Sequence, residues 1–522
     1  MVLSYTDDFS VTWEDPARNS ESWVHDRLHA PWVQPPLTQA LFERIMAIAF
    51  GLPTVFINNY GFMRNFGPPA ETPEVRARGP IPIWEEEFGP HVRLACREMR
   101  NRDYEALTTV QLAERLPQYF EETAEVFRYT TILVFAFLRP TAALITFLEA
   151  ELGEEGGLLA ARLLQGFENE STTAGRGLAR LTALGGASLA LSDALRQGRF
   201  EAIATLDGGP AFLAQLDAYV EEYGWRADSW YMAHLPTWAE YPELAMAQIG
   251  RYLDDPSRAP IAGLERSAAI REAAVAEAES QLADDKLARF RELLAASNDH
   301  VAISESRASW QLQISGSVRV PTMTLGRRLA AAGAIDEPND IFYLTLEQVQ
   351  AAARNPSASC REVVAAAKAE VARCERLTPP IYIGVPPSMS NAPPDLQAVM
   401  RHLRGYGVTL SEDARRINGM GASKGTVTGR ARVIFGLGES HRLQPGDILV
   451  CRTTAPPWTS LFAMAGGVVT DAGGLLSHSA ICAREFGIPA VVATQVGTAR
   501  IPDGALITID GEKGTVLIQG QV

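Results

Sequence analysis

The chain has 522 residues, of which 47% are hydrophobic and 21% charged, so a disordered chain is excluded. This length leaves room for about two to four domains with buried cores. Lysine and arginine total 47 against 62 aspartates and glutamates, a net charge of −15. Such a charge argues against non-specific binding to nucleic acid or anionic membranes, although a local basic pocket could still hold an anion.

Five cysteines without a CxxC pair indicate a reducing compartment, with neither a disulfide framework nor a zinc knuckle. The N-terminal stretch MVLSYTDDFSVTWEDP is acidic and lacks the pattern of a signal peptide. The most apolar stretch, Thr130 to Leu138, is too short to cross a bilayer and predicts a buried helix. We therefore expect a cytoplasmic protein that binds neither nucleic acid nor a membrane.

Helical periodicity dominates residues 37–376. Apolar residues recur at three- and four-residue spacing in LTQALFERIMAIAF, TVQLAERLPQYFEETAEVFRY and LERSAAIREAAVAEAESQLADDKLARFRELLAA. The last stretch, residues 264–296, is rich in Ala, Glu, Arg and Leu and predicts one long exposed helix with a solvated charged face. Residues 1–376 are expected to form a large, mainly α-helical domain.

The remainder of the chain is first rich in proline and then, beyond Gly419, rich in glycine. Six prolines between Pro379 and Pro394 exclude a helix interior or central strand and predict a linker over residues 377–418. Beyond it, GTVTGRARVIF, DILVC, GGVVTD, PAVVAT, ALITID and TVLIQ predict strands, and SHSAICAREFG predicts a helix ending at Gly487. Residues 419–522 are expected to form a compact α/β or β/β/α domain, which makes the whole chain a multi-domain α+β protein.

Residues 470–492, TDAGGLLSHSAICAREFGIPAVV, carry the most informative pattern. A strand runs into paired glycines, and a serine and His478 follow at the start of a helix. Glycines let the backbone approach a bulky anion, and a helix N-terminus offers free N–H groups to phosphate. His478 could then be a nucleophile toward phosphorus, whereas an isolated GGxxSH could equally be a histidine at a helix cap. The residues expected to bind phosphate are Gly473, Gly474, Ser477 and Arg484, the last of which could instead pair locally.

The full pattern GG-x-x-SH-x-A-x-x-AR-x-x-GIPAVV is longer than a chance match. Together with GASKGTVTGRARV and PDGALITIDGEKGTVLI, it resembles the phosphohistidine swivel domain of the phosphoenolpyruvate-utilising enzyme superfamily. The resemblance implies that His478 is phosphorylated during turnover. Leu476 stands where dikinases that are regulated by phosphorylation carry threonine, so that form of regulation is not expected.

The resemblance also has implications for the helical part. Members of the superfamily combine an ATP-grasp domain, the swivelling histidine domain and an acceptor domain, which follows the histidine domain in the pyruvate-using members. Here the chain stops at Val522, so the acceptor domain is expected within residues 1–376. This order resembles rifampin phosphotransferase and the phenol-phosphorylating synthases. Gly326–Val349 and Tyr223–Glu243 resemble segments of the acceptor domain of rifampin phosphotransferase-type proteins.

No ATP-grasp domain is recognised in the sequence. The resemblance therefore implies that a separate ATP-grasp subunit binds ATP and Mg²⁺ and loads His478, while this chain holds no metal and no tightly bound cofactor. The expected activity is a dikinase-type phosphotransfer, in which ATP and water yield AMP, phosphate and a phosphorylated small hydroxyl compound. The alternatives are an ATP-dependent ligase or condensing component of the prodigiosin-condensing type, and a non-enzymatic phosphocarrier or sensor.

Aromatic residues in the helical part would suit a flat phenolic acceptor, although each could equally fill a helical core. His25 and His29 lie at i, i+4 spacing in WVHDRLHAPW and would share a face of a helix. His29 is the expected general base toward the hydroxyl, and its alternative is a purely structural role. The expected substrate-binding residues, each of which could equally form a surface or interdomain contact, are Tyr60, Arg64, Arg226 and His234.

Overall fold

The structure is a computed structural model that describes residues 2–4, 9–12, 15–64, 73–226, 229–254, 260–386, 394–405 and 407–521. The chain forms two compact units, and each unit is assembled from separated stretches of sequence. Unit 1 comprises Met1–Val134, Ser229–Pro236 and Trp310–Asn391, and unit 2 comprises Phe135–Asp228, Thr237–Ser309 and Ala392–Val522. The domain boundaries expected from the sequence, 1–376, 377–418 and 419–522, stay a prediction.

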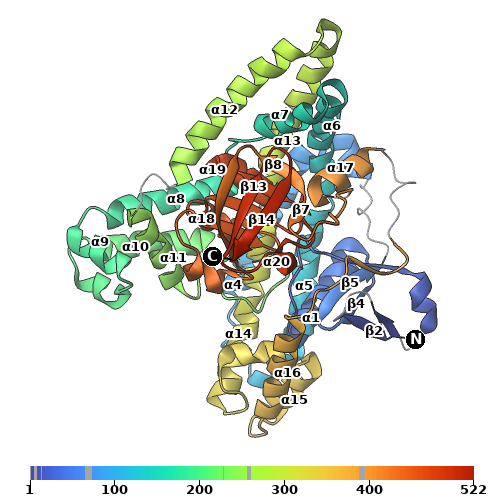
Figure 1. Ribbon diagram of the computed structural model, residues 1–522. Coiled ribbons are helices and arrows are strands. Elements are labelled where there is room, and N and C mark those ends of the chain that lie inside the picture. The colour runs from blue at the N-terminus through green and yellow to red at the C-terminus, as the bar shows by residue number, and fades with distance from the viewer. Residues whose placement is uncertain are drawn as a thin grey trace. The chain divides into compact units, whose positions relative to one another are not determined.

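Unit 1 surrounds a four-stranded antiparallel sheet of order β4-β5-β3-β6 with helices (Figure 1). Strand β6 comes from the proline-rich stretch and occupies a sheet edge, where flanking prolines are tolerated. The core against this sheet includes Phe9, Trp23, Tyr60, Phe62 and Ile383. The strands and main helices of unit 1 are β1 (Val2–Ser4), β2 (Ser10–Thr12), β3 (Ser22–His25), α1 (Pro36–Ile45), β4 (Thr54–Ile57), β5 (Tyr60–Arg64), α2 (Pro73–Arg78), α3 (Pro80–Ile83), α4 (Gly89–Asn101), α5 (Thr109–Thr131), α14 (Arg319–Ala331), α15 (Leu346–Arg354), α16 (Arg361–Cys374) and β6 (Tyr382–Gly384).

The apolar stretch Thr130 to Leu138 is not one helix, contrary to the sequence prediction. Helix α5 ends at Thr131, and α6 (Val134–Leu152) begins after a short turn. Within Thr109–Leu152 one window is long and apolar enough to cross a membrane, and 53% of that window is buried. Core helices of soluble proteins pass the same test, so the expectation that the chain binds no membrane stays a prediction.

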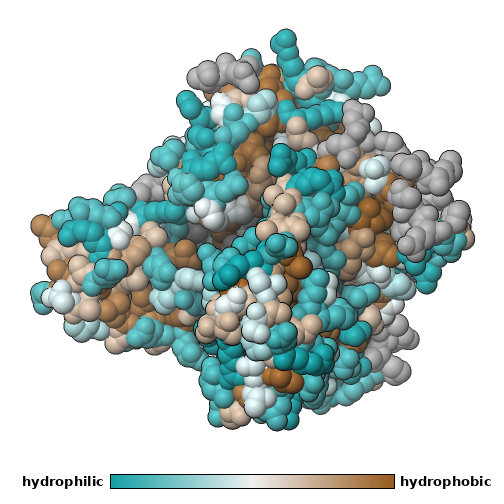
Figure 2. Space-filling model, turned by 90° about the horizontal axis from the view of Figure 1, so that it is seen from below, coloured by the Kyte–Doolittle hydropathy of each residue, from teal (hydrophilic) through white to brown (hydrophobic). Residues whose placement is uncertain are grey.

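The helical part of unit 2 corrects a second expectation. The predicted long helix over residues 264–296 is two helices, because the chain breaks at Leu282 and Ala283 between α12 (Pro260–Gln281) and α13 (Asp284–Ser317). The last residues of α13 belong to unit 1. Figure 2 shows hydrophobic residues among polar ones over the part formed by α8–α11. The remaining helices of this part are α7 (Glu154–Leu163), α8 (Glu170–Gly185), α9 (Leu189–Arg196), α10 (Gly209–Tyr223) and α11 (Pro242–Asp254).

The C-terminal part of unit 2 is an eight-stranded mixed sheet of order β7-β14-β13-β9-β10-β11-β12-β8. Its central strands β9–β12 are parallel and their neighbours antiparallel. Strands β10 and β11 are buried at every residue, which explains the apolar sequence ILVC of β10 and the two valines of β11. Helix α19 (His478–Phe486) packs against this sheet (Figure 1). The other elements are α17 (Pro394–Arg404), β7 (Arg416–Asn418), β8 (Met420–Ser423), β9 (Thr426–Val433), β10 (Ile448–Cys451), α18 (Thr459–Phe462), β11 (Gly467–Thr470), β12 (Ala490–Val492), α20 (Gly497–Arg500), β13 (Ala505–Asp510) and β14 (Thr515–Gln521).

The fold class expected from the sequence is therefore confirmed. A large helical region is followed by a C-terminal sheet domain, and the predicted strands and the helix that begins at His478 are present. That helix also ends as predicted, because Gly487 adopts the left-handed conformation at its C-terminus.

Candidate functional site

His478 is the first residue of α19, directly after a loop that leaves β11. Ser477 caps the helix, because its Oγ accepts a hydrogen bond from the Ala480 N–H at 3.4 Å. The same hydroxyl donates to the Gly474 carbonyl at 2.7 Å and so fastens the loop to the helix start. The local sequence therefore fixes His478 at a helix N-terminus, where unpaired backbone N–H groups favour an anion.

The paired glycines allow the loop to pack tightly. Gly473 has φ +104°, and a Cβ on Gly474 would lie 2.3 Å from the His402 carbonyl oxygen. The Leu476 N–H donates to that same carbonyl at 2.8 Å. The loop before His478 is thus packed against the C-terminal end of α17. The role of these glycines and Ser477 in binding phosphate stays a prediction.

The two imidazole nitrogens of His478 have different neighbours. Nδ1 lies 4.0 Å from Oε2 of Glu305, which α13 contributes. Nε2 lies 3.4 Å from the Thr459 hydroxyl and 3.3 Å from the Cys482 sulfur. His478 as a whole is 9% exposed. The Cys482 sulfur also lies 3.7 Å from Nδ1, so the Glu305 carboxylate is the neighbour that distinguishes Nδ1 from Nε2.

Glu305 was not among the residues predicted from the sequence, because its proximity to His478 depends on how α13 and α19 pack. A further carboxylate, Glu485, lies one turn beyond the middle of α19. Burial raises its pKa to about 8, the nearby Glu305 charge adds to that rise, and Arg484 opposes it. Burial also raises the pKa of the Cys482 thiol well above its usual value, which keeps it protonated. Glu305 is thus the carboxylate that faces His478, whereas the raised pKa keeps Glu485 largely protonated at neutral pH.

Arg484 pairs locally, one of the two outcomes that the sequence left open. The residue is 5% exposed, and its guanidinium donates to the carbonyls of Leu475 at 3.0 Å and Ala422 at 3.3 Å. Burial lowers its pKa to about 10. In this arrangement Arg484 supports the loop before His478, and its role in binding phosphate stays a prediction.

The four expected substrate-binding residues each have contacts of their own. Tyr60 is buried in unit 1 and donates from its hydroxyl to the carbonyls of Cys374 at 3.2 Å and Leu377 at 3.3 Å. Arg64 forms an ion pair with Glu21 at 2.7 Å.

His234 lies in unit 1 and Arg226 lies in unit 2. In unit 1, Nδ1 of His234 lies 3.2 Å from the Thr38 hydroxyl, and burial together with the Arg319 charge lowers the pKa of His234 to about 3. In unit 2, Nε of Arg226 donates to the Tyr223 carbonyl at 3.0 Å. Each of these contacts is structural in kind, and the substrate-binding roles stay predictions.

The helical pairing expected for His25 and His29 is wrong. His25 is the last residue of β3, and its Nδ1 lies 3.1 Å from the Gly61 carbonyl oxygen. His29 lies in the following turn, and its partner is Asp26, whose Oδ2 is 2.9 Å from His29 Nδ1. Within the described part of the chain, no three His, Cys, Asp or Glu side chains gather as candidate metal ligands.

Two family models match the chain. Residues 443–514 match the PEP-utilising enzyme mobile domain, and residues 130–305 match the rifampicin phosphotransferase fourth domain. The first match contains His478 and the second ends at Glu305. The resemblance that the histidine motif predicted is therefore confirmed.

Three relatives illustrate the range of similar proteins. The chondramide synthase of Chondromyces crocatus is 29% identical over 98% of this chain and 14% of its own length. The rifampicin phosphotransferase of Streptomyces sviceus is 37% identical over 38% of this chain and 21% of its own length. The prodigiosin synthesizing transferase of Serratia marcescens is 49% identical over 21% of this chain and 13% of its own length. The chain thus spans less than a quarter of each of these relatives, and the similarity supports a phosphotransferase function.

Proposed function

We propose that this chain is the phosphoryl-carrying component of an ATP-dependent phosphotransferase. The premise is that one segment matches the PEP-utilising enzyme mobile domain and another matches the rifampicin phosphotransferase fourth domain. His478 receives a phosphoryl group that derives from ATP and passes it to the hydroxyl of a small acceptor. A separate ATP-grasp subunit holds ATP and Mg²⁺. The balance is that of a dikinase, with AMP and phosphate as the other products.

The observation that carries this proposal is the setting of His478. It stands at a helix N-terminus behind paired glycines, and Glu305 faces its Nδ1 at 4.0 Å. A carboxylate favours a proton on the nitrogen that it faces, which leaves the lone pair on the other nitrogen. We infer that Nε2 is the nucleophile, because a phosphoryl group on Nδ1 would meet the negative charge of Glu305.

The Glu305 carboxylate also bears on the phosphorylated state. A phosphoryl group adds close to two negative charges, and here it would be placed near the Glu305 carboxylate. His478 is only 9% exposed, so a nucleotide-bearing partner needs it in a more open position. Phosphorylation should therefore weaken the packing of α19 against α13 and favour release of the mobile domain.

The acceptor is proposed to be phenolic, as the aromatic content of the helical part suggests. A second function is favoured by one comparison, since a prodigiosin synthesizing transferase is 49% identical to this chain over 112 residues. In that case the phosphoryl group would activate an acceptor for condensation and would appear only transiently.

The test combines the full chain with an ATP-grasp partner, ATP and a panel of phenols. The proposed function predicts AMP release and a stable aryl phosphate, and both should vanish in His478→Ala. A condensed product with transient phosphate would favour the second function. If no phenol in the panel leads to AMP release, the proposal of a phenolic acceptor is wrong.

A further inference from the structure

A buried carboxylate fixes one histidine of unit 1 in a defined orientation. Asp26 follows β3 and is 2% exposed. Its Oδ1 accepts the backbone N–H groups of Leu28 at 3.2 Å and His29 at 3.3 Å, which holds the carboxylate in place. Its Oδ2 then lies 2.9 Å from Nδ1 of His29. This geometry favours the tautomer in which Nδ1 carries the proton and donates it to Asp26.

The other nitrogen of His29 remains available. No described residue forms a hydrogen bond with Nε2, and the His29 side chain is 24% exposed. A neutral imidazole whose Nδ1–H is held by a carboxylate presents a lone pair on Nε2. That arrangement is the one by which histidine accepts a proton from a hydroxyl.

Trp230 packs on His29 and carries a buried indole N–H as a hydrogen-bond donor. The Trp230 ring stands perpendicular to the imidazole, with ring centroids 5.0 Å apart. Trp230 is 5% exposed, and its Nε1–H has no hydrogen-bond partner in the part of the chain that the structure describes. A buried donor without a partner costs about 1–3 kcal/mol, so an oxygen atom of a ligand would stabilise it.

The backbone that carries Trp230 is strained. Tyr231 is 2% exposed and has φ +64°, a conformation that a bulky residue rarely adopts. Two hydrogen bonds hold this segment in place: the Tyr231 N–H donates to Ser315 Oγ at 3.3 Å, and the Ser229 hydroxyl donates to the His29 carbonyl at 3.3 Å. The base, the indole donor and the strained segment therefore form one fixed arrangement within unit 1.

We propose that Asp26 and His29 form the acceptor-activating dyad of this protein, and that its substrate is an uncharged aromatic compound with a hydroxyl and a second oxygen that accepts from Trp230. The inference rests on the proposed function and deepens it. His29 is the catalytic base, and Asp26 is a positioning residue. In the step itself, the acceptor O–H bond breaks and its proton goes to Nε2 of His29.

The phosphoryl group passes from the imidazole of His478 to the acceptor oxygen. The acceptor oxygen forms a bond to phosphorus, and the N–P bond of phospho-His478 breaks with its electron pair returning to the imidazole. His29 later releases its proton to solvent. Water can replace the acceptor only as a slower nucleophile, because it gains nothing from the aromatic contacts at Trp230.

The experiment uses the full chain after chemical phosphorylation with phosphoramidate, which needs no partner subunit, and the phospho-His478 signal is identified as the one that is absent from His478→Ala. Phenol and 4-hydroxyacetophenone are the aromatic probes, and cyclohexanol is the non-aromatic control. Loss of phosphohistidine and gain of phosphate ester are followed by ³¹P NMR. We expect His29→Gln to slow aromatic-dependent transfer about 100-fold. His441→Gln, at an exposed histidine of unit 2, is the matched control and should transfer at the wild-type rate.

Two further measurements separate catalysis from a structural role. Imidazole in solution should restore transfer to His29→Gly, and ¹⁵N NMR should find the proton of His29 on Nδ1 in the wild type but not in Asp26→Asn. Transfer by His29→Gln at the wild-type rate, or no preference for the aromatic probes over cyclohexanol, would overturn this proposal while leaving phospho-His478 intact. Failure of wild-type His478 to hold a phosphoryl group would instead overturn the proposed function, and this inference with it.

Discussion

The carboxylate of Glu305 lies 4.0 Å from Nδ1 of His478, although α13 and α19 are far apart in the sequence. The contact lies within unit 2 and joins the end of the fourth-domain segment to the mobile domain. A second contact reinforces it, since the Ser267 hydroxyl of α12 donates to the Glu485 carbonyl of α19 at 3.2 Å. Helix α19 thus contacts α13 through one carboxylate and α12 through one hydrogen bond.

Glu305→Gln should slow phosphorylation of His478 about tenfold, because the neutral amide no longer favours a proton on Nδ1. The rate is measured as the appearance of phosphohistidine by ³¹P NMR. Glu292→Gln is the matched control, since Glu292 lies on the same helix and contacts only an exposed arginine in the described structure. Equal rates for both variants would show that Glu305 does not orient the imidazole.

Gly474→Ala should abolish most phosphorylation of His478. Its Cβ would lie 2.3 Å from the His402 carbonyl oxygen, and because that atom belongs to the backbone, the loop must move away from α17. We expect a cost of about 2–3 kcal/mol in the free energy of unfolding, measured with urea. Gly438→Ala is the control, because its Cβ would meet no atom within 4 Å. A Gly474→Ala chain that is as stable and as reactive as this control would refute the tight packing of the loop.

Some features could be predicted from the sequence because they depend on short-range patterns. The runs at residues 448–451 and 467–470 form buried strands, and Ser477 and Gly487 mark the two ends of α19. The pairing of Glu305 with His478 could not be predicted, because it depends on how distant segments pack. The partner of His29 was missed for a different reason: a helix was assumed where β3 ends in a turn, and in that turn Asp26, not His25, reaches the imidazole.

His402 should make unit 2 less stable in mild acid. Burial, with a smaller effect of Arg401, lowers the pKa of His402 from 6.5 to about 4, and neither ring nitrogen has a described hydrogen-bond partner. Between pH 6.5 and 4 the unfolded chain binds a proton that the folded chain does not, so stability falls as the pH falls. Urea unfolding at both pH values should give a loss that is about 2 kcal/mol larger in the wild type than in His402→Gln. An identical pH dependence in the two chains would contradict this assignment.

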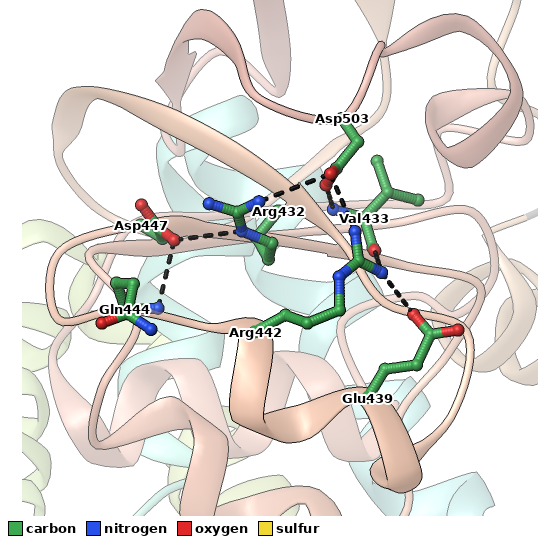
Figure 3. Close-up of polar contacts among 7 residues, drawn as sticks. All are labelled: Arg432, Val433, Glu439, Arg442, Gln444, Asp447 and Asp503. Atoms are coloured by element: carbon green, nitrogen blue, oxygen red, sulfur yellow. Dashed lines mark hydrogen bonds and ion pairs between the residues drawn. The ribbon is translucent and has the colours of Figure 1, made fainter.

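A network of ion pairs should stabilise the mobile domain (Figure 3). Asp447 pairs with Arg432 at 3.3 Å, and Asp503 pairs with Arg442 at 2.8 Å and accepts the Val433 N–H at 2.9 Å. Asp447 is the more buried of the two carboxylates, with a side chain 10% exposed against 39% for Asp503. We expect Asp447→Ala to cost about 2 kcal/mol and Asp503→Ala about 1 kcal/mol in urea unfolding, because exposed pairs are screened by solvent. A larger loss of stability in Asp503→Ala than in Asp447→Ala would show that burial does not decide how much each ion pair contributes.

The most direct test of the account is the intact mass of the full chain after incubation with an ATP-grasp partner and ATP. The account predicts one added phosphoryl group that is labile in acid, stable in base and absent from His478→Ala. A wild-type chain that never gains the group, or a His478→Ala chain that still gains it, would contradict the central role of this histidine.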